Sequence, residues 1–136
     1  MYGDYIVPDD DIFGRLIRAI QFGYLEEFLE LLPLLEDINE KDSSVLEWTP
    51  LMYSVHQESL DMVKALVKAG AGVNLRGIEM DEFALNLAAY GCCAASYGYE
   101  YTRNKKIYDY LFPLTSPELQ QIAEETLNSR TNTIFN

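Results

Sequence analysis

One segment of the chain occurs twice in its first half, and this repetition limits the folds that the sequence can adopt. Residues 23–39 align without a gap on residues 58–74, at an offset of 35. The paired apolar residues are Leu25 with Leu60, Phe28 with Val63, Leu31 with Leu66, Leu32 with Val67 and Ile38 with Val73. A period of this length indicates units that stack on one another and share a continuous core.

The second copy belongs to a unit that predicts two short helices joined by a tight turn. Thr49 is a capping residue, and Pro50 follows at the first helical position, where proline is tolerated. Apolar residues fall at helical spacing over residues 51–55 and again over 60–67, and Gly70 stands where a helix ends. Such a unit cannot cover its own apolar face, so it needs neighbours of the same shape.

A third copy starts near Phe83, but its second helix is delayed. Residues 83–91 align on residues 49–57, with Leu85 on Leu51 and Ala88 on Ser54. About ten residues are inserted before the second helix, within residues 92–106. After this unit, residues 116–128 carry a narrow apolar stripe with glutamates opposite, which predicts a capping helix.

These units resemble the ankyrin repeat family. The matching residues are Thr49-Pro50-Leu51 and Gly70 to Asn74 in the second unit, Gly23, Leu31, Leu32 and Asp37-Ile38-Asn39 in the first, and Leu85 and Ala88-Ala89 in the third. The resemblance implies an all-α solenoid of stacked helix-turn-helix repeats with a C-terminal capping helix. It also implies that loops project to one side and that the protein holds another protein.

We expect the chain to divide into an arm, a repeat domain and a tail. The ranges are an acidic arm at 1–11, an ankyrin-like domain at 12–128 and a tail at 129–136, with repeats at about 12–42, 47–77 and 82–114 and the capping helix at 116–128.

Two departures from the family matter. Met52 stands where the family usually has a bracing His, and Glu58 stands where the turn usually has Gly, which predicts strain or a changed shape there.

The charge of the chain bears on its partners. The formal net charge is -12, which argues against nucleic acid and favours a basic protein partner. No apolar run reaches the length of a membrane span, and the N-terminus is acidic where a signal peptide would be basic, so we expect a cytoplasmic protein. We expect a monomer when no partner is bound.

Nothing in the sequence indicates an enzyme, a cofactor or a metal site. His56 is the single histidine, and Cys92 and Cys93 are adjacent without further Cys or His for zinc. We interpret the cysteines as small buried residues; a cysteine-dependent redox protein is the alternative. Asp9, Asp10 and Asp11 precede the first helix and are interpreted as capping carboxylates, not metal ligands.

The resemblance places candidate partner-binding residues in the groove and on the projecting loops. They are Trp48, His56, Gln57, Glu47, Phe22, Met80, Glu82, Tyr90, Tyr97 and Tyr99. Trp48 either anchors the interface or folds back over the neighbouring turn. Tyr97 and Tyr99 either contact the partner or are placed on the core by an extended helix. We therefore expect a non-catalytic interaction module, and the alternative is an acidic immunity protein or antitoxin that inhibits a basic enzyme such as a nuclease.

Overall fold

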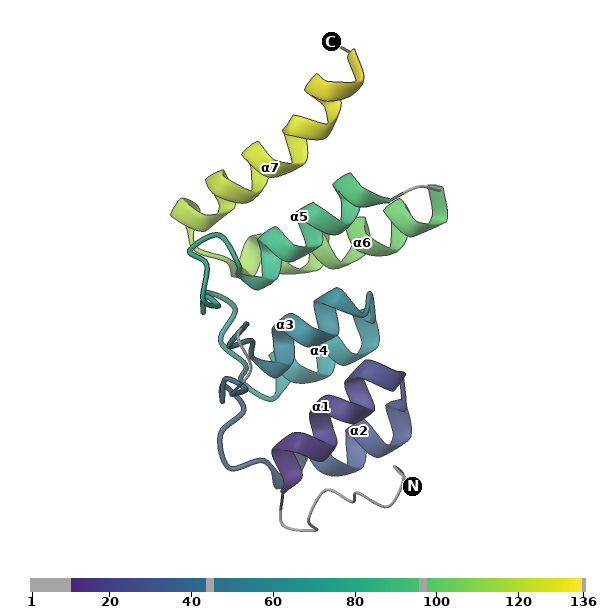
Figure 1. Cartoon of the computed structure of the whole chain (residues 1–136), viewed down its shortest axis with the longest axis vertical. Helices are drawn as coiled ribbons and strands as arrows, with labels where there is room; N and C mark the ends of the chain where they lie inside the picture. Colours follow the sequence, from purple (N-terminus) through teal and green to yellow (C-terminus); the bar gives the residue numbers. More distant parts are fainter. Residues whose placement is uncertain (1–10, 44–45, 96–97, 136) are drawn as a thin grey trace.

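The computed structural model of the chain is a stack of helix pairs with α1 and α2 at one end and α7 at the other (Figure 1). It describes residues 11–43, 46–95 and 98–135, with side chains up to residue 129. The pairs are α1 (Ile12–Phe22) with α2 (Leu25–Leu31), α3 (Pro50–His56) with α4 (Leu60–Lys68), and α5 (Ala84–Ala94) with α6 (Gly98–Leu111). The short 3-10 helices η2 (Leu32–Leu34) and η3 (Phe112–Leu114) follow α2 and α6, and α7 (Pro117–Phe135) ends the chain.

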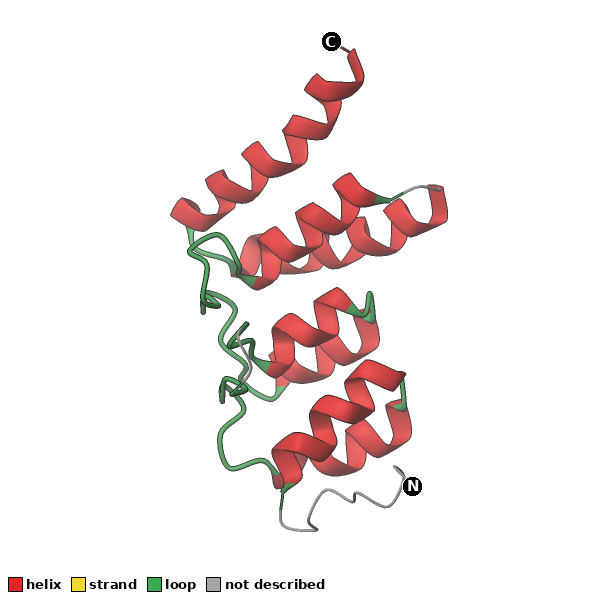
Figure 2. Ribbon diagram, in the orientation of Figure 1, coloured by secondary structure: helices red, strands yellow, loops and turns green. Residues whose placement is uncertain are grey.

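The described part of the chain is helical apart from its loops, and the long loops project from one side of the stack (Figure 2). Its single β-bridge, Arg76 with Phe83, is isolated and forms no strand. The all-α solenoid that the sequence predicts is therefore confirmed.

The ends of the helices follow the local sequence. The Thr49 hydroxyl accepts a hydrogen bond from the Met52 N–H at 3.4 Å, and Pro50 occupies the first helical position. Gly70 adopts a φ of 102° just after α4. At the start of α1, the Asp11 carboxylate accepts from the Gly14 N–H at 3.0 Å, which confirms the capping interpretation for Asp11; Asp9 and Asp10 lie outside the described residues.

The same backbone turn joins the helices of the first and second pairs. The Tyr24 N–H donates to the Ala19 carbonyl at 2.8 Å, and the Ser59 N–H donates to the Ser54 carbonyl at 3.2 Å. Before these donors, Gly23 has a φ of 74° and Glu58 a φ of 61°. The strain predicted at Glu58 is confirmed, because this left-handed conformation favours glycine.

Two equivalent asparagines each bind the segment that follows the second helix of the next pair. Asn39 Oδ1 accepts from the Gly72 N–H at 2.8 Å, and Asn74 Oδ1 accepts from the Ser116 N–H at 3.0 Å. Asn39 and Asn74 occupy the same position in the aligned segments, so these bonds show that the sequence repeat is also a structural repeat.

The core runs continuously through the stack because equivalent positions are buried in every pair. Leucines in α1, α3 and α5 are almost fully buried, and so are the small residues three positions later; they are Leu16, Leu51 and Leu85, and Ala19, Ser54 and Ala88. α1 packs on α3, and α3 packs on α5. The small side chains of Ala19, Ser54 and Ala88 let α1, α3 and α5 approach one another closely.

α7 closes the C-terminal end of the core by packing on α5. Leu119 and Ala123 are buried, and the Cys93 thiol donates to the Thr126 carbonyl at 3.3 Å. Cys92 is fully buried, as expected of a small apolar residue. The tail predicted from residue 129 is helical instead, because α7 runs on to Phe135 through a sequence with no glycine or proline to stop it.

Candidate functional site

One side of the stack combines the exposed positions of the inner helices α1, α3 and α5 with two long loops. We call the loops the first finger (residues 35–49, described except for 44–45) and the second finger (residues 69–83). We call the surface that they form with the inner helices the interaction face. Most of the candidate residues named from the sequence lie on this surface.

One hydrogen bond closes the first finger and another holds it against α3. The Asp42 N–H donates to the Trp48 carbonyl within the finger at 3.0 Å, and the Tyr53 hydroxyl of α3 donates to the Asp42 carboxylate. Between this finger and α1 lies a hollow of about 510 Å³, whose walls include Gln21, Phe22 and residues 40–43. The hollow is of the size that binding sites commonly have.

The second finger is a short hairpin that also contacts the first. The Gly77 N–H donates to the Glu82 carbonyl at 2.7 Å beside the bridge between Arg76 and Phe83. The Ile78 N–H donates to the Leu46 carbonyl of the first finger at 3.2 Å. The tip of the hairpin exposes apolar side chains, and Met80 is 69% exposed.

Asp81 fixes the second finger to α5. The Tyr90 hydroxyl donates to Asp81 Oδ2 at 2.5 Å, and the Asn86 side-chain amide donates to the Asp81 carbonyl at 2.9 Å. The hydrogen bond to Asp81, with smaller effects of burial and of its charge, raises the pKa of Tyr90. The ring of Tyr90 is nevertheless 43% exposed, so it remains open to a partner.

Trp48 does not present its ring to solvent. It is 6% exposed, and its ring packs edge-on against Tyr53 at 5.3 Å and against His56 at 5.5 Å. The structure therefore agrees with the alternative in which Trp48 folds back over the neighbouring turn. An exposed anchor at this position is excluded by the burial of the ring.

The other candidates differ in how far they are exposed. Phe22 is 62% exposed and stacks on Tyr24 at 5.6 Å. The remaining exposed candidates are Glu47, His56, Gln57 and Tyr99, whereas Glu82 is half-buried and accepts a hydrogen bond from the Glu79 N–H at 3.4 Å. Tyr97 lies outside the described residues.

Carboxylates gather beside the first finger. Burial, together with repulsion from Asp37, Asp11 and Glu36, raises the pKa of Glu40. Within the described residues, no group of His, Cys, Asp and Glu has the arrangement of a metal site. The carboxylates around Glu40 contribute negative potential next to the interaction face.

Sequence reasoning missed three exposed or polar features near this face. Tyr24 and Ile78 are more than half exposed, and each lies close in sequence to a candidate that was named. The third feature is an ion pair between Glu58 and Arg103 at 2.7 Å, which joins the second repeat to the third. Its only signal in the sequence was the unusual glutamate at the turn.

No helix among residues 11–43, 46–95 and 98–135 combines the length and the apolar character needed to cross a bilayer. No curated protein matches the chain. The family model for ankyrin repeats matches residues 16–112 with 3 copies. This range covers most of the chain and runs from within α1 to the end of α6. The chain belongs to the ankyrin repeat family.

Proposed function

We propose that this protein is a non-catalytic module that binds one partner protein through the interaction face. Ankyrin repeats generally mediate protein–protein interactions, and the family is typically non-catalytic. The observation that carries the proposal is the exposure of large apolar side chains on this face. Phe22, at the end of α1, and Met80, at the tip of the second finger, are each more than 60% exposed. Exposed apolar groups within a polar rim are typical of a protein interface.

The partner that fits this surface is basic. The formal net charge of the chain is -12, and Glu40, Glu47, Asp81 and Glu82 lie on the fingers. An acidic surface accelerates the encounter with a basic protein and rejects acidic competitors. Binding should therefore weaken at high ionic strength, while the apolar contacts persist.

The test is affinity capture from the native cell lysate with three forms of the protein. A face variant carries Phe22→Ser and Met80→Ser. A matched control carries Leu25→Ser and Leu29→Ser, which remove two apolar side chains at 37% and 48% exposure from α2, a helix that is not part of the face. We expect the wild type and the control to retain the same protein and the face variant to lose it. Equal retention by all three forms would contradict the proposal.

The second candidate function is inhibition of a basic enzyme, as by an immunity protein or antitoxin. The acidic fingers favour it, because they could cover the basic substrate site of a nuclease. Mixing the captured protein with the purified chain distinguishes the two functions. Loss of the partner's enzymatic activity at equimolar ratio supports the inhibitor, and unchanged activity supports the interaction module.

A further inference from the structure

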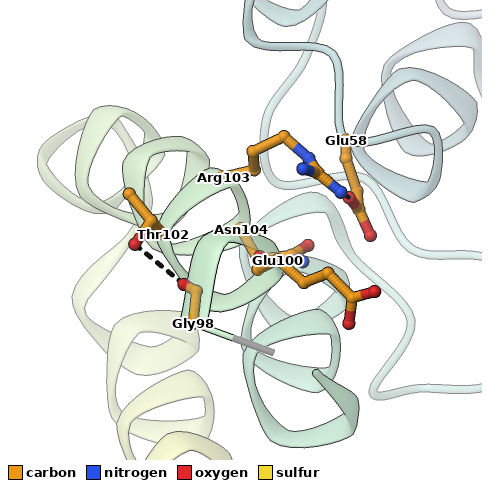
Figure 3. A network of polar contacts seen from close by, with 6 residues as sticks. All are labelled: Glu58, Gly98, Glu100, Thr102, Arg103 and Asn104. Carbon is orange, nitrogen blue, oxygen red and sulfur yellow. Dashed lines mark hydrogen bonds and ion pairs between the residues drawn. The ribbon is translucent and has the colours of Figure 1, made fainter. Parts of the chain in front are cut away.

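Polar contacts join the third helix pair to the parts of the chain before it. At the end away from the fingers, the Glu58 carboxylate meets the Arg103 guanidinium (Figure 3). At the finger end, two side chains of α5 bind Asp81 of the second finger. The Asn86 amide donates to the Asp81 carbonyl at 2.9 Å, and the Tyr90 hydroxyl donates to the Asp81 carboxylate at 2.5 Å. We call these two contacts of Asp81 the clasp.

The packing of the core does not explain why Asn86 stands in the clasp. Asn86 is fully buried, and its side-chain carbonyl oxygen has no hydrogen-bond partner within the described residues. A buried acceptor without a partner costs stability. The aligned residue of the second repeat is Met52, which is apolar and also buried. An apolar residue would therefore suit the core better, and what the asparagine adds is the bond from its amide to Asp81.

The second finger is also attached to the first finger, through a close approach at Gly77. A Cβ built at Gly77 would lie 3.1 Å from Cδ1 of Trp48 and 3.1 Å from the Leu46 carbonyl oxygen. The two fingers therefore lie as close together as a residue without a side chain allows. The next amide, the Ile78 N–H, donates to the same Leu46 carbonyl at 3.2 Å. The second finger is thus attached both to the first finger and, through the clasp, to α5.

We propose that Tyr90 is a positioning residue of the interaction face: its hydroxyl holds the second finger, and with it Met80, in the conformation that meets the partner. This inference rests on the proposed function. Met80 is 69% exposed, so burial of the tip does not fix the conformation of the finger, which depends on its attachments to the first finger and to α5. A finger that is ordered before binding loses less conformational freedom when the partner binds, and this raises the affinity.

Hydrogen exchange of the full chain without a partner tests the clasp. Tyr90→Phe keeps the ring and removes the donor of the hydrogen bond to Asp81. We expect the Gly77 and Ile78 amides to exchange about tenfold faster in this variant, the lower end of what a hydrogen bond to a charged group contributes. The amides of α1 and α3 should exchange as in the wild type. Tyr110→Phe removes a hydroxyl from α6 and is the matched control, for which we expect no change.

Variants of Asp81 separate the clasp from a general loosening of the finger. Asp81→Ala removes the acceptor of the Tyr90 hydroxyl and keeps the backbone carbonyl that Asn86 binds. If the two side chains act through their mutual bond, the double variant should exchange no faster than either single variant. Asp81→Asn keeps an acceptor oxygen and should restore most of the protection. Additive effects of the two single variants would overturn the inference.

Affinity capture from the native cell lysate tests what the clasp does for binding. Tyr90→Phe should retain about fivefold less of the captured protein than Tyr110→Phe, because the loosened finger must be ordered on binding. Equal retention by these two variants, or unchanged exchange of the finger amides in Tyr90→Phe, would overturn the inference and leave the proposed function standing. Full retention by the variant with Phe22→Ser and Met80→Ser would instead contradict the proposed function, and the exchange results on the free chain do not depend on it.

Discussion

The turn between α3 and α4 tests how well the structure explains stability, because Glu58 holds a conformation that glycine favours. Its φ is 61°, close to the 74° of Gly23 in the equivalent turn. A left-handed conformation costs a residue with a Cβ about 1 to 2 kcal/mol. The ion pair with Arg103 opposes this cost; it is partly exposed and contributes at most about 1 kcal/mol.

These opposing effects predict an order among three variants. Gly23→Ala should lower the free energy of unfolding by about 1 kcal/mol through the backbone alone, because no atom lies within 4 Å of a Cβ built there. Glu58→Ala keeps the strain and loses the ion pair, so it should lower the free energy of unfolding by up to about 1 kcal/mol. Glu58→Gly loses both the strain and the ion pair, so it should remain close to the wild type.

The assay is urea unfolding followed by circular dichroism and by the fluorescence of Trp48, the single tryptophan. At about 1 M NaCl the ion pair is largely screened. Under that condition Glu58→Gly should become more stable than the wild type by about 1 kcal/mol, which is a rise of about 4 °C in melting temperature for a chain of this size. Equal stability of Glu58→Gly and Glu58→Ala in high salt would refute the assignment of strain to this residue.

Four further variants test the core and the acidic finger. Ala88→Leu should lower the free energy of unfolding, measured by thermal denaturation, by about 1 to 3 kcal/mol, since Ala88 is fully buried. An unchanged melting curve would contradict the close packing of α5. Trp48→Ala should lower the free energy of unfolding in urea by about 3 to 5 kcal/mol. Trp48→Phe should lower it much less, because Nε1 has no hydrogen-bond partner within the described residues. Equal losses in the two variants would contradict this expectation. Because the pKa of Glu40 is raised, its ionisation lowers the free energy of unfolding of the protein as pH rises through the interval between the ordinary and the raised pKa. Glu40→Gln should therefore raise the melting temperature at pH 7 and have no effect below the ordinary pKa, and a lower melting temperature at pH 7 would contradict the repulsion.

The fold could be predicted from the sequence because the repeat signals are local. Thr49 and Pro50 start a helix, Gly70 follows one, and the aligned leucines mark the buried positions. Each signal depends on neighbours a few residues away and recurs in the next unit. The end of α7 was missed because the polar composition beyond residue 128 suggested a tail, although no glycine or proline there stops the helix before Phe135.

The candidate site was harder to predict because exposure depends on contacts between distant residues. The burial of Trp48 follows from its packing on Tyr53 and His56, and no local pattern separates that arrangement from an exposed ring. The ion pair between Glu58 and Arg103 likewise depends on an insertion whose conformation the repeat pattern does not specify. The two residues lie 45 apart in the sequence.

Site-specific photo-crosslinking in the native cells tests the central claim most directly. p-Benzoylphenylalanine is placed at Phe22 or Met80 on the interaction face, and at Leu25 or Leu29 on α2 as exposed controls outside the face. The account predicts that both face positions form a crosslink to the same protein and that neither control does. Crosslinks to one protein from Leu25 and Leu29, with none from the face, would contradict it.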